Sequence, residues 1–288
     1  MKKKILLISL AVMMFLLALG ITLYPLISSY YNDRHQSQIQ TKYEERLEQI
    51  DNSAKIQAKQ LAIAYNNALK PENQIGEAFT EQTLLEASVD YDAQLNVAGD
   101  GIMCYVEIPR IDVVLPVYHG TDASTLERGV GHLLGSSLPV GGESTHSVLT
   151  AHSGVASMKL FSDLDQLQSG DVFYLHVLGE VLAYQVFDIN TVLPHKTELL
   201  QIQTGKDLST LVTCTPFAVN THRLLVTGER IPYEEAEEIV EEQITHEKPA
   251  QSTWEKQYLQ GVWIGIGAAI ILGLAVLAVW LIRRRRHG

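Results

Sequence analysis

Cysteine is scarce in this chain: only Cys104 and Cys214 occur among 288 residues. Two cysteines cannot build the disulfide framework of a small secreted domain, although a single bond between them stays possible outside the cell. The alternative leaves Cys214 as a reactive thiol and Cys104, in the apolar run 102–108, as a small buried hydrophobe. The sequence also lacks metal-ligand spacings and glycine-rich phosphate loops, so we expect no cofactor.

Charge is missing from two long apolar blocks. The first, Ile5–Ile27, follows three lysines, and the second, Gly261–Ile282, is followed by four arginines. Uncharged stretches of this length with basic flanks are typical of transmembrane helices whose flanks lie in the cytoplasm. We therefore expect an N-terminal anchor over residues 1–28, a second membrane helix over 261–282 and a cytoplasmic tail over 283–288. A cleaved signal peptide is the alternative for the first block, but its apolar core usually has only about 7–15 residues.

Basic residues are also scarce between the two blocks. Seven of the 22 Lys and Arg residues flank the blocks, which leaves 15 basic residues against 33 acidic ones in between. If both blocks cross the membrane, this segment lies outside the cell with a net charge of about −18. Such a surface repels nucleic acid. We expect a two-pass cell-membrane protein with both termini in the cytoplasm and with protein partners.

Glycine and proline are absent from residues 32–70, where apolar side chains recur at helical spacing. This pattern predicts an amphipathic helix that leaves the membrane as a stalk, and it leaves open whether the stalk packs on the next domain or is a solvated spacer. Residues 71–100 indicate a linker with one short helix, so that stalk and linker together span 32–100. A glutamate-rich second linker, 234–260, is expected to be solvated.

Residues 101–233 have a different pattern, because short runs rich in Val, Leu, Ile, Tyr and Thr alternate with Gly, Pro and Asp. This is typical of a closed or nearly closed antiparallel β-fold. Gly179-Glu180 predicts a tight hairpin, and helical turns are expected over Thr125–Val130 and Leu160–Leu167. The expected strands are Met103–Ile108, Val113–Val117, Ser147–His152, Val172–Leu178, Val181–Asn190, Ser209–Thr215 and Leu224–Arg230.

Cys214 stands near the end of an expected strand, two residues before Pro216, which stops strand pairing. A rigid strand end beside a loop suits a nucleophile that must admit a polypeptide. Arg223 precedes the next strand, so an antiparallel pair would bring its guanidinium near the thiol, where it can stabilise an oxyanion. A buried structural cysteine and a surface arginine are the alternatives.

Histidine is the usual acid/base partner of such a thiol. His152 ends the apolar strand that begins at Ser147, and His146 and His222 also lie next to strand ends. The residues alone do not rank the three histidines.

Three motifs carry a resemblance to the sortase family, most strongly to its class C, and the similarity extends over about residues 101–231. They are the TLxTC signature at Thr210-Leu211-Val212-Thr213-Cys214, the histidine motif at Thr150-Ala151-His152-Ser153-Gly154 and the arginine strand at Asn220-Thr221-His222-Arg223-Leu224. The resemblance implies a mainly β fold, an eight-stranded sortase β-barrel with short helices. It also favours His152 over the other two histidines.

By this resemblance the chain is a cysteine transpeptidase that acts on Leu-Pro-x-Thr-Gly (LPxTG) sorting signals. Cys214 would form a thioester with the signal's threonine carbonyl, His152 would protonate the departing glycine amine, and Arg223 would stabilise the oxyanion. Thr213 and Thr215 are expected to help hold the substrate. A class C enzyme passes the acyl group to a pilin lysine and so polymerises pilins, whereas a housekeeping sortase attaches surface proteins to the cell wall.

Two departures from the class pattern concern regulation and the base. Class C members commonly carry an Asp-Pro-aromatic anchor in a lid; this chain has no Asp-Pro between residues 71 and 101, and Asp90-Tyr91 is the nearest remnant. The histidine motif more often reads Thr-Gly-His-Arg-Gly, so Ala151 and Ser153 alter the surroundings of His152. Two other classes stay open, a hydrolytic cysteine peptidase and a non-enzymatic adaptor that only binds pilins.

Overall fold

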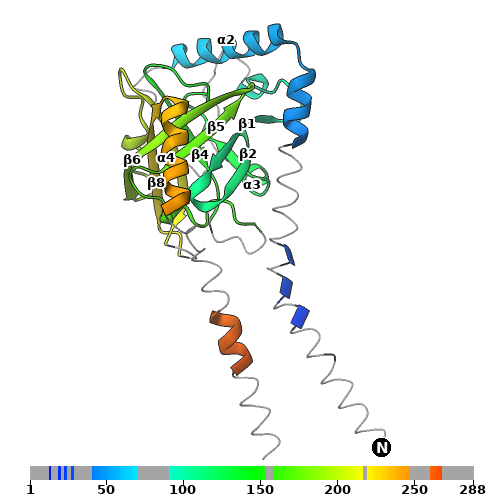
Figure 1. Cartoon of the computed structure of the whole chain (residues 1–288), viewed down its shortest axis with the longest axis vertical. Coiled ribbons are helices and arrows are strands. Elements are labelled where there is room, and N and C mark those ends of the chain that lie inside the picture. Colours follow the sequence, from blue (N-terminus) through cyan, green and yellow to red (C-terminus); the bar gives the residue numbers. More distant parts are fainter. Residues whose placement is uncertain are drawn as a thin grey trace, which may run out of the picture. The chain divides into compact units, whose positions relative to one another are not determined.

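Figure 1 shows the computed structural model of the chain. The chain divides into two units, one formed by Pro25–Ala250 and the other by Met1–Tyr24 with Gln251–Gly288. The described residues are a few between 13 and 28 and the ranges 41–69, 91–153, 158–216, 219–246 and 260–267. None of the helices within this described part is both long and apolar enough to cross a membrane. Most of the two apolar blocks, together with residues 32–40, 70–90 and 247–259, lies outside the described residues, so the anchors and linkers there stay predictions.

The described part of Pro25–Ala250 contains eight strands that close into a barrel in the order β1-β2-β3-β4-β7-β8-β6-β5 (Figure 1). The strands are β1 Ile102–Ile108, β2 Val113–His119, β3 Val130–His132, β4 Thr145–Thr150, β5 Val172–Val177, β6 Glu180–Val192, β7 Asp207–Thr215 and β8 His222–Ile231. The pairs β2–β3 and β4–β7 are parallel, and the other neighbours are antiparallel. The barrel confirms the expected closed β-fold. The expectation that it is antiparallel is wrong at the two parallel pairs, because strand direction depends on the path of the connections and not on the alternation within a strand.

One strand and one turn differ from the sequence prediction. β3 was not expected, because a strand of three residues is too short to show alternation and depends on its partners β2 and β4. The hairpin between β5 and β6 turns at Leu178-Gly179, with φ of 52° and 88°, so that Val177 pairs with Glu180. Positive φ at both central residues matches the twist of the flanking strands.

The helical turns are also short or displaced. α3 covers Ala123–Leu126, earlier than expected, because the Asp122 carboxylate accepts hydrogen bonds from the N–H groups of Ser124 and Thr125 and so begins the helix. The expected turn over Leu160–Leu167 is a 3₁₀ turn, η3 (Leu164–Gln166). Three further 3₁₀ turns are η1 Tyr91–Ala93, η2 Pro109–Ile111 and η4 Glu198–Leu200.

The side chains of the strands alternate between two apolar faces. One face fills the barrel interior, with Leu149 of β4, Leu211 of β7 and Val226 of β8 fully buried. On the opposite face of the same three strands a second cluster contains Val148, Val212 and Leu225 with Leu133 and Leu200. This second face is the one that Cys214 and Arg223 share, because each lies two residues from a member of the cluster.

The stalk packs on the barrel. Residues 41–49 are helical, the chain turns at Ile50-Asp51, and α2 (Asn52–Ala68) runs across one end of the barrel (Figure 1). The Tyr43 side chain is buried and its hydroxyl donates to the Met103 carbonyl at 3.2 Å, while Ala62 and Tyr65 join the barrel core. The described stalk is therefore two packed helices, and the single helix expected over residues 32–70 is wrong at residues 50–51.

Asn66 ties α2 to the segment between β3 and β4. Its side-chain amide donates to the Leu138 carbonyl at 3.1 Å and its oxygen accepts from the Leu138 N–H at 2.7 Å. The carboxamide thus satisfies both backbone groups of one buried residue, as a neighbouring strand would.

The acidic stretch after the barrel is not a solvated linker where it is described. It forms α4 (Tyr233–His246), in which Ala236, Ile239 and Val240 pack on an apolar patch of β5 and β6. Gln243 also donates to the Asp171 carboxylate at 3.1 Å. The sequence prediction failed because the glutamates cover the exposed face and mask a narrow apolar one.

We expect Asn66→Ala to lower the free energy of unfolding by about 1–3 kcal/mol, because the buried Leu138 N–H loses its acceptor, while the Leu138 carbonyl keeps a hydrogen bond from the Val140 N–H at 2.8 Å. Urea unfolding measures the change. The matched control is Asn67→Ala, an exposed asparagine one residue further along the same helix, for which we expect a change below about 0.5 kcal/mol. Equal effects of the two substitutions would contradict the role of Asn66.

Candidate active site

Cys214 lies directly opposite Arg223 in the β7–β8 ladder, so both side chains are on the same face of the sheet. The Ala151 N–H donates to the Val212 carbonyl at 3.1 Å, which shows that the backbone groups of Val212, and of Cys214 two residues on, face β4. Cys214 and Arg223 are therefore a non-hydrogen-bonded pair, in which Cα atoms approach to about 4.5 Å. The register therefore places residues 214 and 223 side by side on one face of the sheet, as expected for an antiparallel pair.

Arg223 is held by its own loop. Its Nη1 donates to the carbonyl oxygens of Asn220 at 3.2 Å and of His222 at 3.1 Å. Asn220 belongs to the connection between β7 and β8, and His222 is the first residue of β8. A guanidinium fixed in this way keeps a defined direction at the strand end.

His152 lies two residues beyond the end of β4, not inside the strand as expected. The last pair of the parallel β4–β7 ladder joins Thr150 to Val212, and continuing this register by two residues brings His152 alongside Cys214. The Phe161 N–H donates to the His152 carbonyl at 3.1 Å, so the backbone of the histidine is also fixed from the following segment. The three candidate residues thus come from the ends of three adjacent strands.

The surroundings of His152 favour the neutral form of its imidazole. Burial lowers the pKa of His152 below its ordinary value, and the nearby Glu127 carboxylate opposes this shift. Glu127 is the residue directly after α3 and is exposed to solvent. A neutral imidazole can accept a proton from a thiol and later return it to an amine.

The structure does not bring the other two candidate histidines, His146 and His222, to the thiol. His146 is fully buried, with Nδ1 2.9 Å from the Gln201 carbonyl and Nε2 2.6 Å from the Thr210 hydroxyl, so both ring nitrogens bridge structural elements. His222 adjoins Arg223 in β8, and successive side chains of a strand point to opposite faces. It therefore lies on the other face from the thiol.

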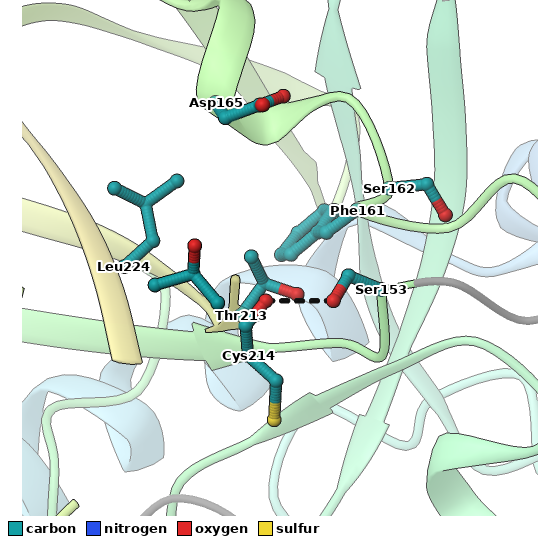
Figure 2. Close-up of a pocket in the computed structure, with 8 residues that line it drawn as sticks. Ser153, Phe161, Ser162, Asp165, Thr213, Cys214 and Leu224 are labelled. Carbon is teal, nitrogen blue, oxygen red and sulfur yellow. Dashed lines mark hydrogen bonds between the residues drawn. The ribbon is translucent and has the colours of Figure 1, made fainter. Parts of the chain in front are cut away.

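A small solvent-open hollow adjoins β7 at Cys214. It is lined by Ser153, Phe161, Ser162, Asp165, Thr213, Cys214, Thr215 and Leu224. Figure 2 shows the Cys214 sulfur pointing away from Phe161 and Asp165, so the hollow lies on the opposite side of the strand from the thiol. Thr213 and Thr215 both line the hollow, and the buried Thr213 hydroxyl donates to the Ala151 carbonyl at 2.8 Å.

Asp165 is the one carboxylate that lines this hollow, and the sequence analysis did not single it out. Burial raises the pKa of Asp165, and the neighbouring Asp163 adds to the shift. The only sequence signal was its place in an expected helical turn between two apolar positions.

Both cysteines are thiols, so the disulfide alternative is wrong. Cys104 is fully buried in the barrel core, where burial raises the pKa of its thiol. This agrees with the expectation that it packs as a small hydrophobe.

Tyr91, part of the sequence that most resembles a lid anchor, packs in the barrel core. Its hydroxyl is 2.8 Å from His132 Nδ1 and its ring contacts His119 edge to face at 5.0 Å. It does not line the hollow beside Cys214, and Asp90 lies outside the described residues. Tyr91 therefore serves the packing of β2 and β3.

Comparison with known proteins agrees with this geometry. Residues 106–231 match the sortase domain family. Sortase C of Streptococcus pneumoniae has 47% sequence identity and a TM-score of 0.63, covering 68% of this chain and 97% of that one. For sortase C-1 of Actinomyces oris the identity is 48% and the TM-score 0.59, covering 62% of this chain and 99% of that one.

A curated relative is sortase D of Bacillus subtilis (strain 168), 31% identical over 129 residues. That match covers 44% of this chain and 62% of the relative, so the chain spans about three fifths of the relative's length. The two sortase C structures, in contrast, are covered almost completely. The chain therefore belongs to the sortase family, in its class C.

Proposed function

We propose that this chain is a transpeptidase that cleaves an LPxTG-type sorting signal through a thioester on Cys214 and transfers the acyl part to a pilin lysine, polymerising pilins. The observation that carries the proposal is the register of β7, which sets Cys214 directly opposite Arg223, while the segment that follows β4 carries His152 alongside Cys214. A nucleophile, a base and a cation at the ends of three adjacent strands suit acyl transfer.

In the first half-reaction the Cys214 sulfur attacks the threonine carbonyl carbon of the signal. His152 takes the thiol proton and gives it to the glycine nitrogen as the C–N bond breaks. Arg223 stabilises the negative charge on the tetrahedral oxygen. The product is an acyl thioester on Cys214 and a free glycine amine.

In the second half-reaction an amine attacks the thioester carbon, the C–S bond breaks and a new amide forms. The proton lost by the amine passes to His152 and then to the leaving sulfur, so the enzyme returns to its starting state. The thioester conserves the energy of the cleaved peptide bond, which matters outside a membrane where ATP is absent.

The acceptor amine is proposed to be a pilin lysine. The similarity to the sortase C of Streptococcus pneumoniae, which is described in terms of pilin substrate specificity, supports this choice. A housekeeping activity, with a cell-wall amine as acceptor, is the second candidate, and sortase A proteins are among the relatives at 28–31% identity.

We also propose that Thr213 and Thr215 help to hold the signal, and that the catalytic domain lies outside the cell between two membrane anchors. Their place in β7, directly before and directly after Cys214, supports the first point. The basic flanks of both apolar blocks support the second.

The first test is mass spectrometry of the full chain in detergent, incubated with an LPxTG peptide and a lysine-containing acceptor peptide. We expect an acyl adduct on Cys214 and ligation that depends on the acceptor. Cys104→Ala should keep the adduct, because that thiol is buried in the core, and Cys214→Ala should lose it. Release to water alone would indicate a peptidase, preference for a glycine or cell-wall amine would indicate the housekeeping activity, and no adduct would contradict the proposal.

Arg223→Lys should lower kcat by about 10²–10³-fold with little change in KM, since a lysine cannot reproduce the fixed guanidinium opposite Cys214. Steady-state kinetics of peptide ligation measures this. Arg230→Lys, near the other end of β8, is the matched control and should keep kcat within about twofold. A rise in KM alone would assign Arg223 to substrate binding instead.

Glu127→Gln should lower the pKa of His152 further, because it removes the carboxylate that opposes the effect of burial. An NMR titration of the His152 ring protons measures the shift, which should shrink at high salt. Glu143→Gln is the control: it precedes β4 while His152 follows it, and six strand residues separate the two by about 20 Å. A rise in the His152 pKa after Glu127→Gln would refute the assignment.

A further inference from the structure

Two side-chain hydrogen bonds connect the segments that carry the base and the nucleophile. The Ser153 hydroxyl donates to the Cys214 carbonyl at 2.7 Å, and the Thr213 hydroxyl donates to the Ala151 carbonyl at 2.8 Å. Figure 2 shows the Ser153 bond reaching across from the loop after His152 to the end of β7. Each bond starts one residue away from a candidate catalytic residue.

These bonds lie where the parallel ladder stops. Its last described backbone bond runs from the Ala151 N–H to the Val212 carbonyl. If the parallel ladder continued regularly, the Cys214 N–H would donate to the Ala151 carbonyl. The Ser153 N–H would then donate to the Cys214 carbonyl. In this chain the Ser153 hydroxyl reaches that same carbonyl, although β4 itself ends at Thr150.

We propose that Ser153 is a positioning residue, whose hydroxyl holds the β7 end that carries Cys214 against the segment that carries His152. This inference rests on the proposed transpeptidase function and gives a role to a residue at which this chain departs from the more common histidine motif. Serine stands where sortases more often have arginine, and its short hydroxyl side chain donates directly to a carbonyl of the adjacent strand.

The bond acts on geometry and not on signal binding. The Ser153 donor directly follows His152, and its acceptor belongs to Cys214 itself, so this bond is the one nearest to both groups among those that fix the two segments against each other. Its loss loosens the distance between imidazole and thiol. A misplacement of about 1 Å between reacting groups can reduce a rate by about 10²-fold. The sulfur points away from the hollow that Ser153 lines, so the signal bound at the thiol need not contact this serine.

The test compares the full chain in detergent with Ser153→Ala, Ser153→Thr and Thr145→Val. Thr145, at the beginning of β4, donates its hydroxyl to the Gly142 carbonyl at 2.7 Å, so Thr145→Val removes a similar bond far from His152. We expect Ser153→Ala to lower kcat of peptide ligation at least about tenfold with KM and melting temperature nearly unchanged. Ser153→Thr should restore kcat to within about threefold, and Thr145→Val should leave kcat unaltered.

A second readout needs no substrate. The rate of iodoacetamide reaction at Cys214 is measured between pH 5 and 9, roughly the range in which imidazole and thiol groups titrate. Wild type and Ser153→Thr should share an inflection from the titration of His152, and Ser153→Ala should lose or shift it. Cys104 does not interfere, because it is fully buried.

The outcomes separate the two proposals. If the alkylation rate of wild-type Cys214 shows the inflection but no peptide is ligated, the transpeptidase function is refuted. The alkylation profiles of the Ser153 variants would still decide the role of Ser153. Unchanged kcat and an unchanged profile in Ser153→Ala would overturn that role, as would an equal loss in Thr145→Val or no recovery in Ser153→Thr.

Discussion

The site depends on the pairing of β7 along both of its edges. β4 runs parallel to β7, and β8 runs antiparallel to β7. The C-terminal ends of β4 and β7 and the N-terminal end of β8 therefore meet at one end of the barrel. That geometry alone brings a residue after β4, a residue near the end of β7 and a residue at the start of β8 together. Residues 62 and 9 positions from Cys214 in the sequence become its neighbours without any element dedicated to the task.

A buried polar chain keeps these three strands in register. His146 of β4 bonds the Thr210 hydroxyl of β7 at 2.6 Å, and Thr210 bonds Thr227 of β8 at 2.9 Å. On the barrel's inner face Ser147 and Ser209 bond each other at 2.9 Å. Polar groups inside an apolar core must be paired, and a wrong alignment of the strands would leave them unsatisfied. The packed stalk and α4 add support from two other parts of the barrel.

The sequence predicted those features that local pattern determines. Alternation and turn residues located seven of the eight strands, and the short connection after Cys214 implied that Arg223 lies beside it. Features that need a partner were missed: β3 exists through its neighbours, and α4 is docked by a narrow apolar face. The three histidines could not be ranked from their residues, because burial and ring partners decide between them. The Ser153 bond depends on the path of a loop that no periodicity encodes.

The double pairing of β7 also joins correct folding to chemical competence. Because side chains of a strand alternate, a slip of β7 by one residue would turn the thiol toward the interior and present a threonine hydroxyl in its place. Such a misaligned barrel would keep nearly the same backbone and much of its apolar content, yet it would carry no sulfur at the reactive edge. Selection for an active enzyme therefore also selects for the correct register of β7.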